Sequence, residues 1–273
     1  MSKLDPADFP DAINALTAIS IAAANSIREP LAPGSVRIKA DGSPVTSADE
    51  AAEAVVHDGL TRLTHPLPIV SEESWKGESF GSKSDCYYLV DPLDGTKEYI
   101  AGRNEYTINI ALVSDGLPVL GVITAPALGL IWRGILGRGA ERLEFVSHKA
   151  LSPQPIRSRS PPAGEFIVML SRTHLDPATE AYLKHLPHTR RIACGSSLKF
   201  CRLAEGAADH YPRLGPTRDW DVAAGHAILT AAGGTVTEPD GSPLKYGTSG
   251  LRIPSFLAWG DPARAQNTFR DSR

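Results

Sequence analysis

The eight residues from Leu89 to Thr96, Leu-Val-Asp-Pro-Leu-Asp-Gly-Thr, constrain the fold more than any other part of the chain. Apolar residues of a strand lead directly into two aspartates that lie three positions apart. Pro92 fixes its own φ and restricts the residue before it, so Asp91 is held at a stiff strand exit. Gly95 permits a tight turn with positive φ. Both carboxylates and the Leu93 carbonyl can therefore surround one point, and hard oxygen ligands of this kind suit Mg²⁺.

Two aspartates at this spacing also fit a plain turn, with an aspartate as the cap and the glycine at the corner. Other acidic residues lie at predicted element ends: Glu72 and Glu73 follow a strand, and Asp221 precedes a helix. Taken singly, the glutamates fit a solvated surface pair and Asp221 fits a helix N-cap. Three such groups are harder to attribute to coincidence, and the fold decides whether they converge.

Apolar periodicity predicts the elements of the first half of the chain. Helices are predicted over 12–27 and 47–63, and strands over 67–70 and 87–90. The second helix begins with a capping box at 47–50, and its predicted buried face contains Ala51, Val55, Val56 and Leu60. Over 106–133, apolar runs alternate with turn signals, as in an antiparallel meander.

A stretch rich in Pro, Ser and Arg, over 151–164, is the predicted domain junction. Beyond it, strands are predicted over 166–170 and 209–211, and helices over 178–186, 197–206 and 222–232. Because strands and helices alternate here, we expect an α+β domain over 1–150 and an α/β domain over 151–273.

Composition narrows the class of protein. Hydrophobic residues make up 42% of the chain and charged residues 22%, as in a soluble globular enzyme, and the net charge of −3 argues against a nucleic-acid partner. Three cysteines without a Cys-x-x-Cys pair argue against disulfides or zinc and favour the cytoplasm. The apolar stretch over 12–27 is too short and too polar to span a bilayer. Peripheral attachment at the inner face of the membrane and the oligomeric state stay open.

Two of these motifs carry a family resemblance. Asp91-Pro-Leu-Asp-Gly-Thr96 and Trp220-Asp-Val-Ala-Ala-Gly225 resemble the two signatures of the inositol monophosphatase superfamily, which comprises lithium-sensitive, Mg²⁺-dependent phosphomonoesterases. Three further segments resemble the bacterial 3′(2′),5′-bisphosphate nucleotidases of the CysQ type: Ser171-Arg-Thr-His174, Gly195-Ser-Ser-Leu-Lys-Phe-Cys201 and Tyr211-Pro-Arg-Leu-Gly-Pro216. The similarity runs from about residue 12 to about residue 260. It implies a layered αβαβα sandwich of the inositol monophosphatase and fructose-1,6-bisphosphatase type.

The resemblance also implies roles for single residues. The implied ligands of two or three Mg²⁺ ions are Glu72, Asp91, the Leu93 carbonyl, Asp94 and Asp221. Thr96 and Asp49 match the pair that orients and deprotonates the attacking water, with Glu73 assisting. For Asp49, a favourable interaction with the helix dipole is the alternative explanation.

On the substrate side, the resemblance implies that the N–H groups of Gly95 and Thr96 cradle the scissile phosphate. Ser196, Lys199 and Arg213 match residues that hold the second phosphate and the nucleoside, and His174 matches a further substrate residue. The alternatives are a surface or cap histidine, a helix lysine that extends to solvent, and an arginine in a surface ion pair.

The implied activity is hydrolysis of adenosine 3′,5′-bisphosphate to AMP and phosphate, a reaction of sulfur metabolism and nucleotide recycling. One alternative is an inositol or sugar monophosphate phosphatase on the same fold. Another is an inactive module that binds bisphosphorylated nucleotides, although all the expected carboxylates and Thr96 are present.

Overall fold

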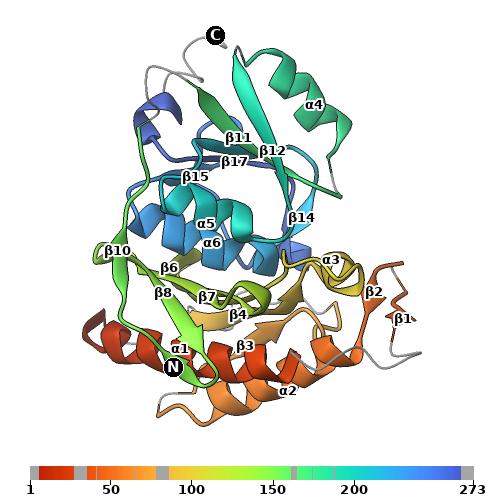
Figure 1. Ribbon diagram of the computed structural model, residues 1–273, viewed down its shortest axis with the longest axis vertical. Helices are drawn as coiled ribbons and strands as arrows, with labels where there is room; N and C mark the ends of the chain where they lie inside the picture. Colours follow the sequence, from red (N-terminus) through yellow and green to blue (C-terminus); the bar gives the residue numbers. More distant parts are fainter. Residues whose placement is uncertain are drawn as a thin grey trace.

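The computed structural model describes residues 6–27, 36–40, 42–64, 66–77, 86–160, 165–173, 175–186 and 188–265. Helices and sheets alternate in five layers (Figure 1). The helices are α1 (Phe9–Ile27), α2 (Ser47–Thr61), α3 (Thr96–Ile100), α4 (Pro177–Lys184), α5 (Leu198–Ala204) and α6 (Asp219–Ala231). Helices α1 and α2 form the first outer layer, α5 and α6 the middle layer, and α4 the other outer layer. The expected αβαβα sandwich is confirmed.

A mixed sheet of eight strands separates the α1–α2 layer from the middle helices, in the order β10-β8-β7-β6-β5-β4-β3, with β9 paired to β8. Its strands are β3 (Ile69–Ser71), β4 (Cys86–Asp94), β5 (Thr107–Ser114), β6 (Leu117–Ala125), β7 (Leu130–Ile135), β8 (Gly139–Val146), β9 (Lys149–Ala150) and β10 (Gln154–Ile156). β3 runs parallel to β4, and the other neighbours pair antiparallel. The predicted meander is therefore confirmed.

A second sheet of five strands follows the middle helices, in the order β12-β11-β13-β17-β15. Its strands are β11 (Phe166–Ser171), β12 (Thr189–Cys194), β13 (His210–Arg213), β15 (Thr235–Thr237) and β17 (Phe256–Trp259). Two short ribbons complete the fold: β1 (Arg37–Ile38) with β2 (Pro44–Val45), and β14 (Thr217–Arg218) with β16 (Arg252–Ile253). The division into two domains stays a prediction.

Strand β4 is apolar from Cys86 to Val90, where both of its faces are covered. Tyr87 and Leu89 pack in the core shared with the middle helices, whereas Tyr88 and Val90 pack against the α1–α2 layer. The strand runs past Asp91 to Asp94, and its register against β5 shifts between those two aspartates. Both aspartates stay paired with β5, Asp91 with Asn109 and Asp94 with Thr107, and the irregularity lies between them.

Small residues bring α6 against the first sheet. A Cβ atom on Gly121 of β6 would lie 2.4 Å from the Ala224 oxygen, and one on Gly134 of β7 would lie 3.0 Å from Ile228 Cα. The backbones approach this closely only because the glycines lack side chains. Helix α6 therefore lies directly on this sheet, against β4 to β8.

Several predicted details of the elements are corrected. The buried side of α2 consists of Ala48, Asp49, Ala52, Val56 and Leu60, so Ala51 and Val55 are only partly buried. The capping box lies one position earlier, at Thr46 and Asp49. Trp220 and Asp221 lie within the first turn of α6 rather than before it. Strands β8, β12, β15 and β17 are not indicated by the sequence pattern.

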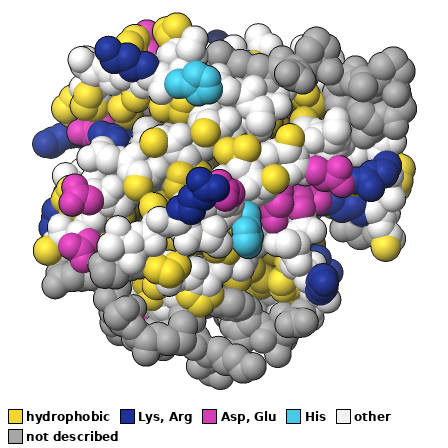
Figure 2. Space-filling view, turned by 90° about the horizontal axis from the view of Figure 1, so that it is seen from below, with side chains coloured by type: hydrophobic (Ala, Val, Ile, Leu, Met, Phe, Trp, Pro, Cys, Tyr) yellow, Lys and Arg dark blue, Asp and Glu magenta, His cyan; other side chains and the backbone are white. Residues whose placement is uncertain are grey.

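The outer face of α1 and α2 carries acidic, basic and histidine side chains among apolar ones (Figure 2). Within the described residues, no helix combines the length and the apolar character needed to cross a bilayer.

Candidate metal and phosphate site

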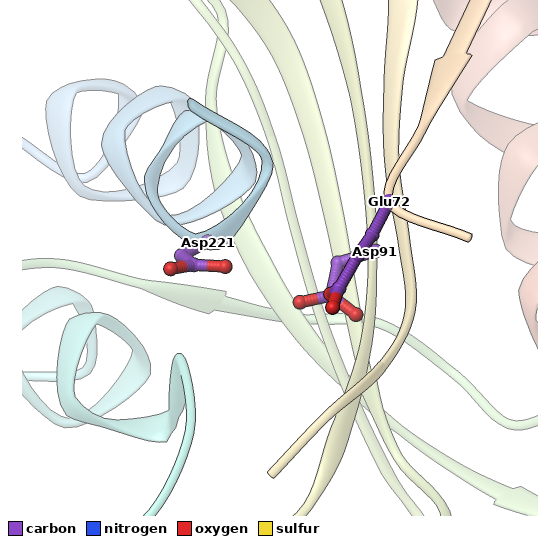
Figure 3. Close-up of side chains that lie close together, drawn as sticks. All are labelled: Glu72, Asp91 and Asp221. Carbon is purple, nitrogen blue, oxygen red and sulfur yellow. The ribbon is translucent and has the colours of Figure 1, made fainter. Parts of the chain in front are cut away.

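Three carboxylates from separate elements meet at one point. Glu72 lies in the turn after β3, Asp91 lies in β4, and Asp221 lies in the first turn of α6. Each offers an oxygen within 4.8 Å of the others. Figure 3 shows Asp221 at the end of its helix, facing the other two. The structure thus brings together residues separated by 149 positions in the chain (221 minus 72).

Burial sets the electrostatics of these carboxylates. Asp91 is only 1% exposed, and its Oδ1 accepts a hydrogen bond from the Leu93 N–H at 3.0 Å. Burial, followed by the charges of Glu72, Asp94 and Asp221, raises its pKa well above the ordinary range. Burial also raises the pKa of Glu72 to about 7, with a further contribution from Asp221.

Asp94 connects this cluster to the substrate side. Burial and the charge of Asp221 raise its pKa to about 7, while Lys199 and the Ser197 N–H act in the opposite direction. Its Oδ2 accepts the Ser197 N–H at 2.6 Å. Buried carboxylates that repel one another are stabilised by a divalent cation, and hard oxygen donors suit Mg²⁺. The donor set therefore fits a metal ion.

Lys39 was given no role from the sequence, although it lies only ten residues before Asp49. Its Nζ donates to Glu72 at 2.8 Å and to Glu73 at 2.6 Å. Burial alone would lower the pKa of this ammonium, but the two glutamates raise it above its ordinary value. Burial in turn raises the pKa of Glu73, against the effect of Lys39. No local pattern could have revealed this contact, because it joins β1 and its loop to the turn after β3.

A hydrogen-bonded pair of the half-buried Thr96 and the buried Asp49 lies beside the cluster. The Thr96 hydroxyl lies 3.0 Å from Asp49 Oδ1 and 3.2 Å from the Leu93 carbonyl oxygen. The other Asp49 oxygen accepts from the Thr46 N–H at 2.8 Å and the Thr46 hydroxyl at 2.7 Å. Burial raises the pKa of Asp49, whereas these hydrogen bonds lower it. The structure therefore places the predicted pair, Thr96 and Asp49, in direct hydrogen-bond contact.

Gly95 adopts the predicted positive φ, at 92°, immediately before α3. A Cβ here would lie 3.1 Å from the Glu105 carbonyl oxygen and 3.4 Å from Ser196 Cβ. The loop after β4 and the loop before α5 therefore approach each other closely at this glycine.

Ser196, Lys199 and Arg213 line the same pocket as the carboxylates, a cavity of about 670 Å³. Lys199 is 3% exposed, and its Nζ donates to the Cys194 oxygen at 3.2 Å and to the Ser196 oxygen. It is therefore not a lysine extended into solvent. Arg213 donates to the Pro216 oxygen at 3.2 Å. Within the described part of the chain Arg213 is in no ion pair, and His174 lies outside the described residues.

Comparison with known proteins agrees with this architecture. A model of the inositol monophosphatase family matches residues 11–269, and the chain belongs to that family. The family is metal-dependent, and the cluster of Glu72, Asp91 and Asp221 could hold a metal ion.

The 3′(2′),5′-bisphosphate nucleotidase CysQ of Escherichia coli (strain K12) is 45% identical over 214 residues, which are 78% of this chain and 84% of that protein. The crystal structure of CysQ from Bacteroides thetaiotaomicron superposes with a TM-score of 0.79 at 34% identity, covering 91% of this chain and 97% of that one. Inositol monophosphatase from Anabaena gives a TM-score of 0.74 at 28% identity, covering 96% and 95%.

Proposed function

We propose that this protein is a Mg²⁺-dependent phosphomonoesterase that hydrolyses the 3′-phosphate of adenosine 3′,5′-bisphosphate to give AMP and phosphate. The observation that carries the proposal is the shared pocket, which is lined both by the carboxylates and by Ser196, Lys199 and Arg213. An acidic end suits cations that bind the scissile phosphate, and a basic end suits a second phosphate. Relatives named as CysQ nucleotidases support the choice of substrate.

Two or three Mg²⁺ ions would be held by Glu72, Asp91, Asp94, Asp221 and the Leu93 carbonyl. When bound, they would supply positive charge that activates a water and stabilises the charge developing on the phosphoryl oxygens. Asp91 is buried and Glu72 and Asp94 are half-buried, and burial together with the neighbouring carboxylates raises the pKa of each, so a positive charge placed among them would be favoured.

Thr96 and Asp49 would orient and deprotonate the attacking water. A threonine hydroxyl is a poor base alone, so a carboxylate must take up the proton. In this pair, Thr96 Oγ1 accepts the proton of the water as its own proton passes to Asp49 Oδ1, 3.0 Å away. Glu73 would assist by accepting a hydrogen bond from a neighbouring water.

The remaining residues would position the substrate. The N–H groups of Gly95 and Thr96 would bind the scissile phosphate. Lys199, Arg213 and Ser196 would bind the second phosphate and the nucleoside, and His174 would contribute on the same side. A fixed guanidinium fork and an ammonium both suit phosphate oxygens.

The test measures phosphate release by the purified protein from adenosine 3′,5′-bisphosphate with Mg²⁺ and with EDTA. We expect release that requires Mg²⁺ and exceeds release from inositol 1-phosphate. Rapid release from inositol 1-phosphate alone would support the monophosphatase alternative. Tight binding of the bisphosphate without turnover under any divalent metal would support an inactive binding module.

A further inference from the structure

A cation–aromatic stack joins the two segments that carry Glu72 and Asp221. The guanidinium carbon of Arg218 lies 5.1 Å from the Trp75 ring centroid and 5.5 Å from the Trp220 ring centroid. The two indole rings lie 5.6 Å apart at an angle of 64°. Trp75 follows the turn that holds Glu72 and Glu73, and Trp220 directly precedes Asp221.

Each member of the stack is anchored on its own side. The backbone N–H of Trp75 donates to the Ser71 carbonyl oxygen at 2.9 Å, and this hydrogen bond closes the turn that contains the two glutamates. Trp220 is buried in the core, and Trp75 packs against that core. Arg218 Nη1 donates to the Gly250 carbonyl at 2.8 Å, and the Arg218 N–H donates to Asp221 Oδ2 at 3.2 Å. A shift of the stack would therefore shift both carboxylate-bearing segments.

Glu72 and Asp221 carry charges of the same sign and have oxygens within 4.8 Å of each other, so they repel one another. Repulsion alone does not hold the two carboxylates at a fixed separation, so another contact must do so when no cation is bound. We propose that Arg218, whose guanidinium packs against both Trp75 and Trp220, is a positioning residue that holds the Glu72 turn against the start of α6 at the spacing that a divalent cation requires. This inference rests on the metal site of the proposed function.

Arg252 provides a matched control. It lies directly opposite Arg218 in the β14–β16 ribbon and lines the same pocket. Its side chain is exposed, and it makes no hydrogen bond, ion pair or ring contact within the described residues. Removing either arginine removes a positive charge beside the site. By Coulomb's law, the loss of that charge reduces repulsion of the cation and favours its binding. Only the loss of Arg218 also removes the two cation–aromatic contacts, so its charge and its positioning role predict opposite changes in Mg²⁺ affinity.

The experiment is calorimetric titration of Mg²⁺ into the full chain, without substrate. Cation–π contacts are worth about 0.5–2 kcal/mol, so we expect Arg218→Ala to weaken Mg²⁺ binding by about 2-fold to 30-fold. Arg252→Ala should leave the affinity unchanged or slightly higher. Trp75→Ala should resemble Arg218→Ala, whereas Trp75→Phe, which keeps an aromatic face, and Arg218→Lys, which keeps a cation, should lie closer to the wild type.

Thermal unfolding in EDTA shows whether each variant is folded. If Arg218→Ala does not fold, Mg²⁺ binding by Arg218→Lys provides the test. An Arg218→Ala affinity equal to or higher than that of the wild type would overturn the positioning role. So would an equal loss in Arg252→Ala. If the wild-type chain itself binds no Mg²⁺, the metal site of the proposed function fails first, and that outcome is distinguishable because it precedes any variant.

Discussion

Asp94 is the residue at which the acidic and basic ends of the pocket meet. On one side it is repelled by the charge of Asp221. On the other side its Oδ2 accepts a hydrogen bond from the backbone N–H of Ser197, at the start of α5. Its position explains why a single carboxylate can matter both for cation binding and for the placement of the helix that carries Lys199.

Asp94→Asn is expected to lower kcat by about 100-fold or more, because it removes a charge from the cation site. The amide oxygen can still accept the Ser197 N–H, so the fold and its unfolding midpoint in EDTA should be retained. Steady-state phosphate release and thermal unfolding check the two halves of this prediction. Persisting activity would show that Asp94 is not a metal ligand.

Arg213→Ala is expected to raise KM for adenosine 3′,5′-bisphosphate by about tenfold or more, because a charge-assisted hydrogen bond to the remote phosphate is lost. Adenosine 3′-monophosphate lacks that phosphate, so its KM should change much less. Arg190→Ala is the matched control, since Arg190 forms an exposed ion pair with Glu165. Equal effects of Arg213→Ala on both substrates would contradict the assignment.

His210 gives the molecule a dependence of stability on pH that is separate from the metal site. It is fully buried, stacks on Trp259 with centroids 3.6 Å apart, and contacts the Tyr182 hydroxyl and the Ala258 carbonyl. Burial lowers its pKa from 6.5 to about 3, so between these values the unfolded chain binds a proton that the folded chain does not. Stability from this group is therefore full above pH 6.5 and is lost as the pH falls toward 3.

We expect this one histidine to lower the free energy of unfolding by about 1–2 kcal/mol between pH 6.5 and about pH 5. Denaturant unfolding of the wild type and of His210→Gln at both pH values measures it, because all other titrating groups cancel in the difference. The variant should lose less stability than the wild type over this interval. An identical loss in both proteins would show that His210 does not titrate as described.

At the scale of elements, the sequence could predict most helices and strands but not every register. In α2, period-3.6 reasoning located the helix, yet the buried side is set by contacts with α1 and the sheet, which turned Ala51 and Val55 partly outward. β12 has exposed arginines and no clear alternation, so its membership of a sheet depends on pairing with β11. Tertiary packing decides which side of a helix is buried and whether a strand joins a sheet, and the local sequence gives little indication of either.

Gly225→Ala tests the close contact between α5 and α6. In an ordinary helix this change stabilises by about 1 kcal/mol. Here a Cβ would lie 2.4 Å from Phe200 ring atoms, so overpacking should reverse the sign and destabilise by about 1–3 kcal/mol. Denaturant unfolding measures the change, and Phe200→Leu in the same chain should reduce its cost. A stabilised Gly225→Ala protein would show that the helices can separate freely.

At the scale of the whole molecule, the motifs around Asp91 and Asp221 could be recognised in the sequence, and the fold was predicted from them. The structure places Glu72, Asp91 and Asp221 together and pairs Thr96 with Asp49. Lys39 and the Trp75–Arg218–Trp220 stack could not be predicted, because each joins segments that come together only when the layers assemble. Pairwise contacts of this kind have no spacing rule within the chain.

The central claim is that carboxylates from β4, the turn after β3 and the start of α6 hold divalent cations. The most direct measurement is anomalous scattering from crystals of the protein grown with Mn²⁺ in place of Mg²⁺. We predict anomalous peaks at coordination distance from Glu72, Asp91 and Asp221. The absence of any peak at these carboxylates, with Mn²⁺ bound elsewhere or not at all, would contradict the account.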